Sequence, residues 1–182
     1  ISSFSSKIDR RYQKQIIFAG RLSHEKGTDI LINISQKLSD DIHLIVLGTG
    51  PEEKKIKDIV KNYKNIHFFG YQNKEKTISL IRGSDILIQP SLNEGISSTI
   101  LEAMVSKTLV ITTNVGGNKE LIINNQTGYL LSLNSDLFIE KINYILSHKS
   151  QLEKIINNAF RFVQKYNWNV IGKKYLNLYQ NL

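Results

Sequence analysis

The feature that most constrains this chain is a repeated alternation of short apolar runs with longer amphipathic stretches. The apolar runs cover residues 16–20, 42–48, 65–70, 85–90, 108–113 and 128–132. Most are β-branched or aromatic and nearly continuous in hydrophobicity, as expected of strands that are buried on both faces. The stretches between them carry helical periodicity. Strand–helix–strand units of this kind predict an α/β fold with a Rossmann-like, doubly wound parallel sheet of about six strands.

The length of 182 residues is sufficient for one domain with a hydrophobic core. We expect a single domain over residues 1–182, with a core over 14–133 and a tail over 134–182 in which every pattern is helical. Ile1 is not a translational start, and the one methionine in the chain is Met104. We therefore expect this chain to be a piece of a longer protein.

The composition is that of a soluble globular protein, with 41% hydrophobic and 9% aromatic residues. No apolar run approaches the roughly 18 residues that a membrane-spanning helix needs, and residues 1–11 contain no secretory signal. Cysteine is absent, which excludes disulfides, thiolate zinc sites and cysteine nucleophiles. These features favour a cytoplasmic protein and leave open a peripheral membrane contact of the full-length protein.

The net charge is +8, from 24 basic and 16 acidic residues, and the isoelectric point is near 9.5. Such a charge favours anionic partners, among them nucleotide phosphates, nucleic acid and an anionic membrane surface. Many lysines lie at helical spacing in residues 52–64, where a solvated helix face explains them. Since no nucleic-acid-binding motif is present, we do not expect nucleic acid as a partner.

Several motifs that would define other enzyme classes are missing. The sequence "GTGPEE" from Gly48 lacks the third glycine of the dinucleotide fingerprint, and no P-loop sequence occurs. There is no G-x-S-x-G of an α/β-hydrolase and no D-x-D triplet, and the four histidines have no metal-binding spacing. The sequence therefore argues against a Rossmann dehydrogenase, a P-loop enzyme and a hydrolase, and it predicts no metal site.

Two polar loops follow strands that are expected to be neighbours. Ligands of open α/β sheets bind beyond the carboxyl ends of the strands, where the strand order reverses. In the common order 3-2-1-4-5-6, the loops over residues 20–27 and 91–98 flank that point. The first loop contains Arg21, which offers a bidentate fork to phosphate oxygens, and Lys26, which offers a point charge. The alternative is that both are solvated surface cations.

The second loop precedes a predicted helix. Gly95 allows a close backbone approach, and Ser97 or Ser98 is positioned to cap the helix, whose amino terminus is a potential anion site. Glu94 precedes the turn and Glu102 lies about one turn inside the helix, so both could face a polar ligand. The alternative is that Glu94 complements the helix dipole and Glu102 is an exposed helix acid. Spacing alone leaves both interpretations open.

Five motifs in order resemble one known family: "FAGRLSHEKG", "LIVLGTGP", "IHFFGY", "SDILIQPSLNEGISSTILEAM" and "TTNVGGNKELI". They are similar to the carboxyl-terminal, donor-binding domain of family-4 retaining glycosyltransferases of GT-B fold, from about Ile16 to Leu131. The resemblance implies one half of a GT-B fold, without the amino-terminal acceptor-binding domain. Ile96-Ser97 stands where the family commonly has Phe-Gly, which affects the expected sugar identity more than phosphate binding.

The resemblance also implies roles for individual residues. Glu94 and Glu102 resemble the E-x7-E signature, in which the second acid holds the ribose hydroxyls and the first lies beside the transferred sugar. Gly116 and Gly117 match a glycine pair near the cleft. The remaining implied roles are diphosphate binding by the cations and base binding near Tyr71. The expected site residues are Glu94, Arg21 and Lys26 as catalytic groups, and Glu102, Gly95, Ile96, Ser97, Ser98, Gly20 and Tyr71 as donor-binding groups.

The function that the resemblance implies is retaining, metal-independent hexosyl transfer. The donor would be a nucleotide-diphosphate sugar, with a UDP-sugar expected, and the acceptor a glycan or lipid-linked molecule in polysaccharide biosynthesis. No cofactor is expected, and this chain alone should transfer little or no sugar. The alternatives are a non-catalytic nucleotide-binding module and, more distantly, a nucleic-acid-binding domain.

Overall fold

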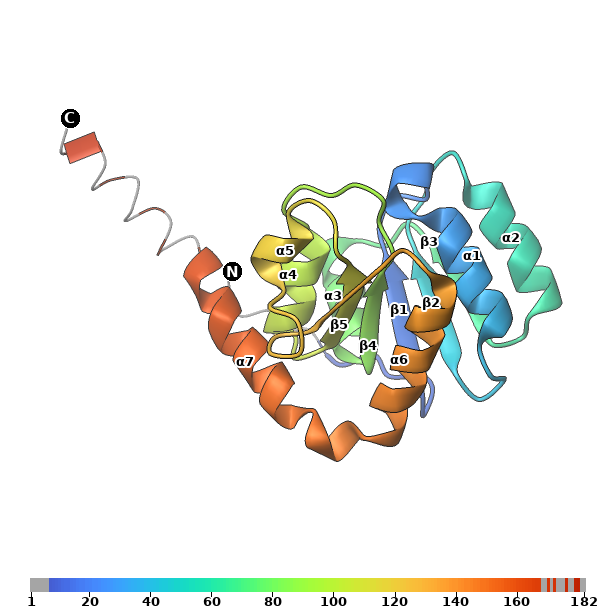
Figure 1. The fold of residues 1–182 in the computed structure, drawn as a ribbon. Coiled ribbons are helices and arrows are strands. Elements are labelled where there is room, and N and C mark those ends of the chain that lie inside the picture. The colour runs from blue at the N-terminus through green and yellow to red at the C-terminus, as the bar shows by residue number, and fades with distance from the viewer. Residues whose placement is uncertain (1–6, 168–169, 171, 173–175, 177–178, 181–182) are drawn as a thin grey trace.

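The fold is built on one six-stranded parallel sheet (Figure 1). The computed structural model describes residues 7–167, 170, 172, 176 and 179–180. The strand order is β3-β2-β1-β4-β5-β6, and each neighbouring pair is parallel. The predicted doubly wound sheet and its order are therefore confirmed. The strands are β1 (Gln15–Ala19), β2 (His43–Leu47), β3 (Ile66–Gly70), β4 (Ile86–Gln89), β5 (Leu109–Thr113) and β6 (Tyr129–Leu131).

Helices cover both faces of the sheet (Figure 1). One face is covered by α1 (Thr28–Lys37), α2 (Glu53–Asn62) and α6 (Ser135–Ser147). The other is covered by α3 (Lys74–Arg82), α4 (Ser98–Val105), α5 (Asn118–Leu121) and α7 (Glu153–Val163). Short 3-10 helices are η1 (His24–Lys26), η2 (Lys149–Gln151) and η3 (Gln164–Tyr166). No helix in the described part of the chain is both long and apolar enough to cross a membrane.

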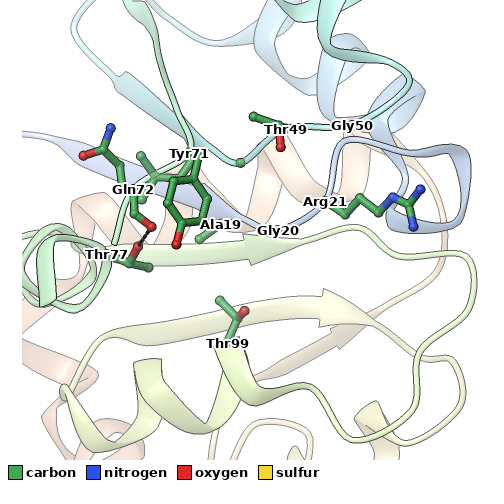
Figure 2. A pocket seen from close by; sticks show the side chains of 11 residues that line it. Ala19, Gly20, Arg21, Thr49, Gly50, Tyr71, Gln72, Thr77 and Thr99 are labelled. Carbon is green, nitrogen blue, oxygen red and sulfur yellow. Dashed lines mark hydrogen bonds between the residues drawn. The ribbon is translucent and has the colours of Figure 1, made fainter. Parts of the chain in front are cut away.

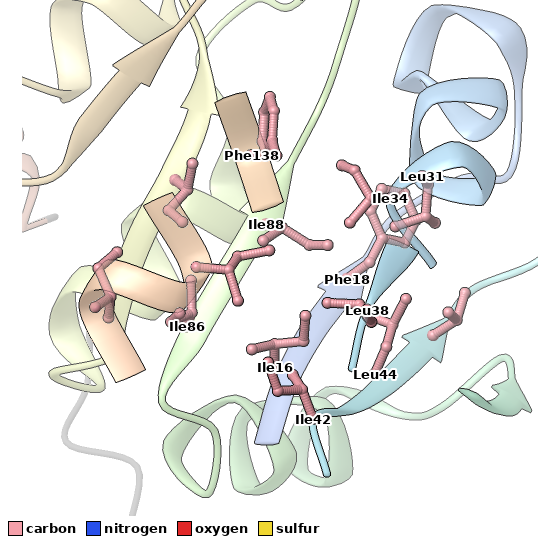
Figure 3. Packing of buried hydrophobic residues seen from close by; sticks show 14 of the residues in the cluster. Ile16, Phe18, Leu31, Ile34, Leu38, Ile42, Leu44, Ile86, Ile88 and Phe138 are labelled. Carbon is pink, nitrogen blue, oxygen red and sulfur yellow. The ribbon is translucent and has the colours of Figure 1, made fainter. Parts of the chain in front are cut away.

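The two faces of each central strand enter two separate hydrophobic clusters. In β1, Ile16 and Phe18 pack towards α1 and α6, whereas Ile17 and Ala19 pack towards α3 and α4. Figure 3 shows Phe18 beside Leu31 and Ile34 of α1, and it shows Phe138 of α6 near Ile88 in the same cluster. Because alternate residues of a strand point to opposite faces, burial on both sides requires the nearly continuous hydrophobicity seen in the sequence.

The helices after β6 are part of this core. Phe138 and Ile142 of α6 are fully buried, and α6 packs against α1. Ala159 and Val163 of α7 are buried in the cluster that α4 also enters. Residues 134–163 therefore close the two faces of the sheet. The helix expected over residues 169–182 falls largely outside the described residues.

Some details of the fold lie outside the sequence prediction. Helix α2 begins at Glu53, and Pro51 lies in the preceding turn. The short helices η1 and α5 were not predicted, because three or four residues are too few to show a helical period.

The amino-terminal edge of the sheet is held by an ion-pair network. The Asp85 carboxylate accepts hydrogen bonds from Arg10 at 2.9 Å, from Lys149 at 2.8 Å and from the backbone N–H of Gln15 at 3.0 Å. Its side chain is 11% exposed. The Gln15 amide in turn donates to the Ser84 hydroxyl at 3.0 Å. These contacts join the segment before β1, the start of β4 and η2, which are far apart in sequence.

Candidate functional site

A cleft of about 520 Å³ opens at the carboxyl-terminal edge of the sheet (Figure 2). The ends of β1 and β2, the segment after β3 and the helices α3 and α4 all contribute to it. It borders the point between β1 and β4 where the strand order reverses, the usual ligand position in such sheets. The residues that line it are Ala19, Gly20, Arg21, Leu47, Gly48, Thr49, Gly50, Tyr71, Gln72, Thr77 and Thr99.

The Gly-Thr-Gly loop after β2 packs directly on the loop after β1. A Cβ atom at Gly48 would lie 1.9 Å from the carbonyl oxygen of Gly20, and one at Gly50 would lie 2.3 Å from that of Leu22. The Leu22 N–H donates to the Thr49 carbonyl at 2.9 Å. Glycine is therefore required here by the close approach of two backbones. Although "GTGPEE" is not a dinucleotide fingerprint, it shapes one wall of the cleft.

Arg21 is an exposed cation on the cleft wall. Within residues 7–167, its guanidinium takes part in no hydrogen bond or ion pair, so its five N–H donors face the open space. In Figure 2 it lies at the opposite end of the cleft from Tyr71 and Gln72. The pKa of the neighbouring Glu25 is lowered, mainly by a hydrogen bond from Ser23 and in smaller part by the charge of Arg21. Arg21 is thus available to an anionic ligand.

Lys26 and Glu94 form an ion pair between the two loops that were predicted to meet. The Lys26 Nζ lies 2.6 and 2.7 Å from the two carboxylate oxygens of Glu94, whose side chain is only 7% exposed. The Ser91 hydroxyl donates to the same carboxylate at 2.9 Å. The backbone N–H of Leu92 also donates to the carbonyl of Glu25 at 2.8 Å, which fastens the loops together. Neither Lys26 nor Glu94 lines the cleft itself.

Buried polar side chains hold the loop after β4 in place. The Thr113 hydroxyl donates to the Ser91 carbonyl, and the Thr112 hydroxyl donates to the Gln89 carbonyl at 2.9 Å. The Asn118 amide donates to the Thr112 hydroxyl at 2.8 Å. All five residues are almost completely buried. Because hydrogen bonds fix both strand ends, the loop after β4 has a defined position relative to β5.

The glycine pair after β5 also packs against this loop. A Cβ atom at Gly116 would lie 2.0 Å from the Glu94 carbonyl oxygen, and one at Gly117 would lie 2.4 Å from that of Gly95. The Gly117 N–H donates to the Glu94 carbonyl at 2.9 Å. At Gly95 itself, a Cβ atom would meet nothing within 4 Å. Close backbone packing within the chain therefore occurs at Gly116 and Gly117, and the close approach expected at Gly95 stays a prediction.

The start of α4 is capped as the sequence suggests. The Ser97 hydroxyl accepts a hydrogen bond from the backbone N–H of Ile100 at 3.4 Å, which makes Ser97 the capping residue, and Ser98 is the first helical residue. One turn further, the Glu102 carboxylate accepts a hydrogen bond from Lys74 of α3. Its side chain is 12% exposed. Glu102 is therefore a largely buried, paired acid and not a freely exposed one.

The structure separates the expected site residues into groups. Gly20, Arg21 and Tyr71 line the cleft, whereas Glu94 and Lys26 pair beside it. The other expected residues, Gly95, Ile96, Ser97, Ser98 and Glu102, lie on the turn before α4 or in that helix, outside the lining. No group of three or more potential metal-binding side chains occurs among the described residues.

Other residues of this region were missed by the sequence interpretation. Thr49 and Gln72 follow strand ends, and that position is a signal that could have found them. Thr77 and Thr99 lie on helix faces that become part of the cleft only when α3 and α4 are placed in space. No sequence signal identifies them.

The fold and the cleft define a Rossmann-like α/β domain of the kind that forms one half of a GT-B enzyme. Residues 3–162 match the family described as glycosyl transferases group 1. The chain belongs to this family.

Curated relatives extend the same conclusion. The chain is 30% identical over 175 residues to an uncharacterised glycosyltransferase of Methanocaldococcus jannaschii, covering 92% of this chain and 45% of the relative. It is 25% identical over 177 residues to the 2-deoxystreptamine N-acetyl-D-glucosaminyltransferase of Niallia circulans, covering 93% of this chain and 46% of that protein. The chain therefore spans about half the length of the curated relatives that it matches.

Solved structures share the architecture. The Anabaena protein HepE in complex with UDP-glucose superposes with a TM-score of 0.83 at 21% identity, covering 92% of this chain and 49% of HepE. The C-terminal domain of the glycosyl transferase group 1 family protein LpcC from Francisella tularensis gives a TM-score of 0.73 at 28% identity. The match covers 86% of this chain and 87% of that structure. The fold of this chain is thus similar to that of the C-terminal domain of LpcC.

Proposed function

We propose that this chain is the donor-binding domain of a glycosyltransferase that uses a nucleotide-diphosphate sugar. The observation that carries the proposal is Arg21, a cation without a partner among residues 7–167, on the wall of a cleft at the carboxyl edge of β1. Membership of the group 1 glycosyl transferases supports the reaction class. The likeness in fold to HepE, which was solved with UDP-glucose, favours a UDP-sugar as the donor.

Each end of the cleft suits a different part of such a donor. Arg21 at one end, with Lys26 beside the cleft, would hold the diphosphate, and Tyr71, which is 76% exposed, would offer its ring and backbone to the base at the other. Glu102 would accept hydrogen bonds from the ribose hydroxyls. The sugar would lie near Glu94 and the turn before α4.

The charges fit the demand of the reaction. When the sugar leaves a nucleotide donor, negative charge grows on the β-phosphate, and fixed cations or a helix amino terminus stabilise it. Arg21 is free to do so, whereas Lys26 is bound to Glu94 and must share its charge between that carboxylate and the phosphate. We propose retaining, metal-independent hexosyl transfer to a glycan or lipid-linked acceptor. A further, acceptor-binding domain would hold that acceptor.

A calorimetric titration with UDP, GDP, ADP and UDP-glucose tests this proposal. We expect saturable binding of one nucleotide, which Lys26→Ala and Glu102→Ala each weaken about tenfold or more, since hydrogen bonds to charged groups contribute about 1.5–3 kcal/mol. Lys61→Ala is the matched control, because Lys61 pairs with Asp58 on the exposed face of α2. Absence of saturable binding to all four compounds would contradict the proposal.

Nucleic-acid binding gains no support from the described residues. Several basic residues are held in ion pairs within the chain, as are Lys37 with Asp136 and Lys57 with Glu53. A non-catalytic nucleotide-binding module would bind UDP in the same way. Sugar transfer from UDP-glucose by the full-length protein, with little or none by this chain, separates the enzyme from that module.

A further inference from the structure

Lys74 is the first residue of α3 and reaches across to α4. Its Nζ donates to the Oε1 atom of Glu102. The Asn73 side chain caps α3 by accepting from the Lys76 backbone N–H at 2.9 Å, so the helix start that carries Lys74 is fixed. The Lys74 side chain is 55% exposed and that of Glu102 is 12% exposed. The lysine therefore approaches a largely buried carboxylate from the solvent side.

The two helices that carry this pair also close one side of the cleft. Thr77 of α3 and Thr99 of α4 both line it (Figure 2). Lys74 lies three residues before Thr77, and Glu102 lies three residues after Thr99, and residues three apart share a helix face. The ion pair thus joins the same helix faces that border the ligand space.

The contact leaves part of the Glu102 carboxylate available. An ionised carboxylate has about four hydrogen-bond acceptor positions on its two oxygens. Over residues 7–167, the Glu102 carboxylate accepts no hydrogen bond other than that from Lys74 to Oε1, so Oε2 remains open. Glu94 differs, because Lys26 contacts both of its oxygens and Ser91 adds a further bond. A vicinal diol supplies two O–H donors and can use the positions that Lys74 leaves.

We infer that Lys74 is a positioning residue that orients the Glu102 carboxylate towards the ribose hydroxyls, and that this pair sets the preference for ribonucleotides over 2′-deoxyribonucleotides. The inference rests on the proposed function, in which Glu102 holds the ribose. A cation fixed on one oxygen limits the rotation of the carboxylate and directs the other oxygen to the ligand. Removing it leaves Glu102 free to turn, so the second hydroxyl contributes less to binding.

A purely structural role for Lys74 predicts a different result. If the ion pair only fastened α3 to α4, its loss would loosen the cleft. The affinity for every nucleotide would then fall by the same factor. The ratio of ribonucleotide to deoxyribonucleotide affinity would then stay constant. This ratio is therefore the quantity to measure.

The experiment is a calorimetric titration of this chain with UDP, GDP and their 2′-deoxy counterparts. We expect the wild type to prefer the ribonucleotide and Lys74→Met to reduce that preference about fivefold, the effect of one ordinary hydrogen bond. Lys74→Arg, which keeps a cation at the position, should retain most of the preference for the ribonucleotide. Lys76→Met is the matched control, because Lys76 lies on the same helix and pairs with Asp9 at 2.6 Å, away from the cleft.

The outcomes separate this inference from the proposed function. An unchanged preference in a Lys74→Met protein that melts like the wild type overturns the inference alone. Equal wild-type affinity for ribo- and deoxyribonucleotides overturns the inference and the ribose-binding role of Glu102, and it leaves the proposal of a donor-binding domain standing. A wild type that binds none of the four nucleotides overturns the proposed function and the inference together.

Discussion

The two edges of the sheet use similar charged residues for different purposes. At the amino edge, Asp85 is surrounded by Arg10, Lys149 and the backbone of Gln15, and all of these contacts join distant parts of the chain. At the carboxyl edge, Arg21 faces a cleft and has no partner in residues 7–167. The charges of Asp85, Arg10 and Lys149 at the first edge are satisfied within the fold, whereas Arg21 at the second is left for a ligand.

This difference leads to a simple expectation. Substitutions at the amino edge should change the free energy of unfolding and leave nucleotide affinity unchanged. Substitutions of exposed cations at the carboxyl edge should lower nucleotide affinity and leave the free energy of unfolding unchanged. Residues that support the carboxyl-edge loops should affect both quantities, because the loops belong to the fold and also border the ligand space.

The largest effect is expected for Asp85→Ala. This change removes the carboxylate that Arg10, Lys149 and the backbone N–H of Gln15 share, and we expect the free energy of unfolding to fall by about 3 kcal/mol, the upper end for a hydrogen bond to a charged group. Urea unfolding measures the loss. The UDP affinity of the folded variant should stay within about twofold of the wild type, an estimate for a site without ligand contact.

A matched control is Asp58→Ala on α2. Asp58 pairs with Lys61 in an exposed contact three residues apart, so its loss should cost about 0.5 kcal/mol or less. If both variants unfolded at the same urea concentration, the amino-edge network would have no special role in stability.

The next effect is expected for Gly117→Ala, at the support of the carboxyl-edge loop. The added Cβ atom would lie 2.4 Å from the Gly95 carbonyl oxygen, so the loop or the glycine pair must shift, at a cost of about 1–3 kcal/mol. Thermal melting should show the loss of stability, and titration should show weaker UDP-glucose binding.

Gly95→Ala provides the contrast within the same loop. Its Cβ atom would meet nothing within 4 Å, so the melting temperature should not change. Equal destabilisation by the two alanines would contradict the close packing of Gly117 against the loop.

Arg21→Ala should weaken UDP binding about tenfold, or about 1.5 kcal/mol, the contribution of a charge-assisted hydrogen bond. Its effect on unfolding should stay within about 0.5 kcal/mol, because the side chain is exposed and is not engaged within residues 7–167. Titration and urea unfolding of the same variant measure both values. A large loss of stability with unchanged affinity would reverse the contrast between the two edges.

The sequence predicted the carboxyl edge better than the amino edge. Strand periodicity fixes the sheet, and the order of an open sheet then brings the loops of Lys26 and Glu94 together, as the structure shows. Their contact depends on strand ends, which hydrophobic runs mark clearly. The glycine pair, Gly116 and Gly117, could be identified from the sequence through the family resemblance. Its packing against the Glu94 backbone could not be predicted from the sequence.

Contacts between distant side chains were not predictable in this way. Arg10 and Asp85 are separated by 75 positions, and Lys74 and Glu102 by 28. Each pair depends on how a helix or a terminal segment is placed on the sheet and on which rotamer the side chain adopts. Periodicity reports the buried face of an element but not which charged residues meet above it.

The smallest effect concerns histidines at the amino edge. The rings of Tyr12, His43 and His67 stack, with centroids 4.0 Å apart for Tyr12 and His43 and 4.5 Å apart for Tyr12 and His67. The Nδ1 of His43 and the Nε2 of His67 are 3.0 Å apart. Burial lowers the pKa of His67 from its usual value, and the charges of His43 and Arg11 lower it further.

A lowered histidine pKa makes the folded protein less stable in acid. On acidification, the unfolded chain binds a proton near the ordinary histidine pKa of about 6.5, whereas folded His67 binds it only at lower pH. This contribution to stability is fully present above that pH and is lost as the pH falls towards the folded pKa. His67→Gln should therefore reduce the drop in urea midpoint between pH 7.5 and pH 5.5 and leave UDP affinity at pH 7.5 unchanged. An identical drop in both proteins would mean that other groups cause the acid sensitivity, whereas a changed affinity would show that the two edges are coupled.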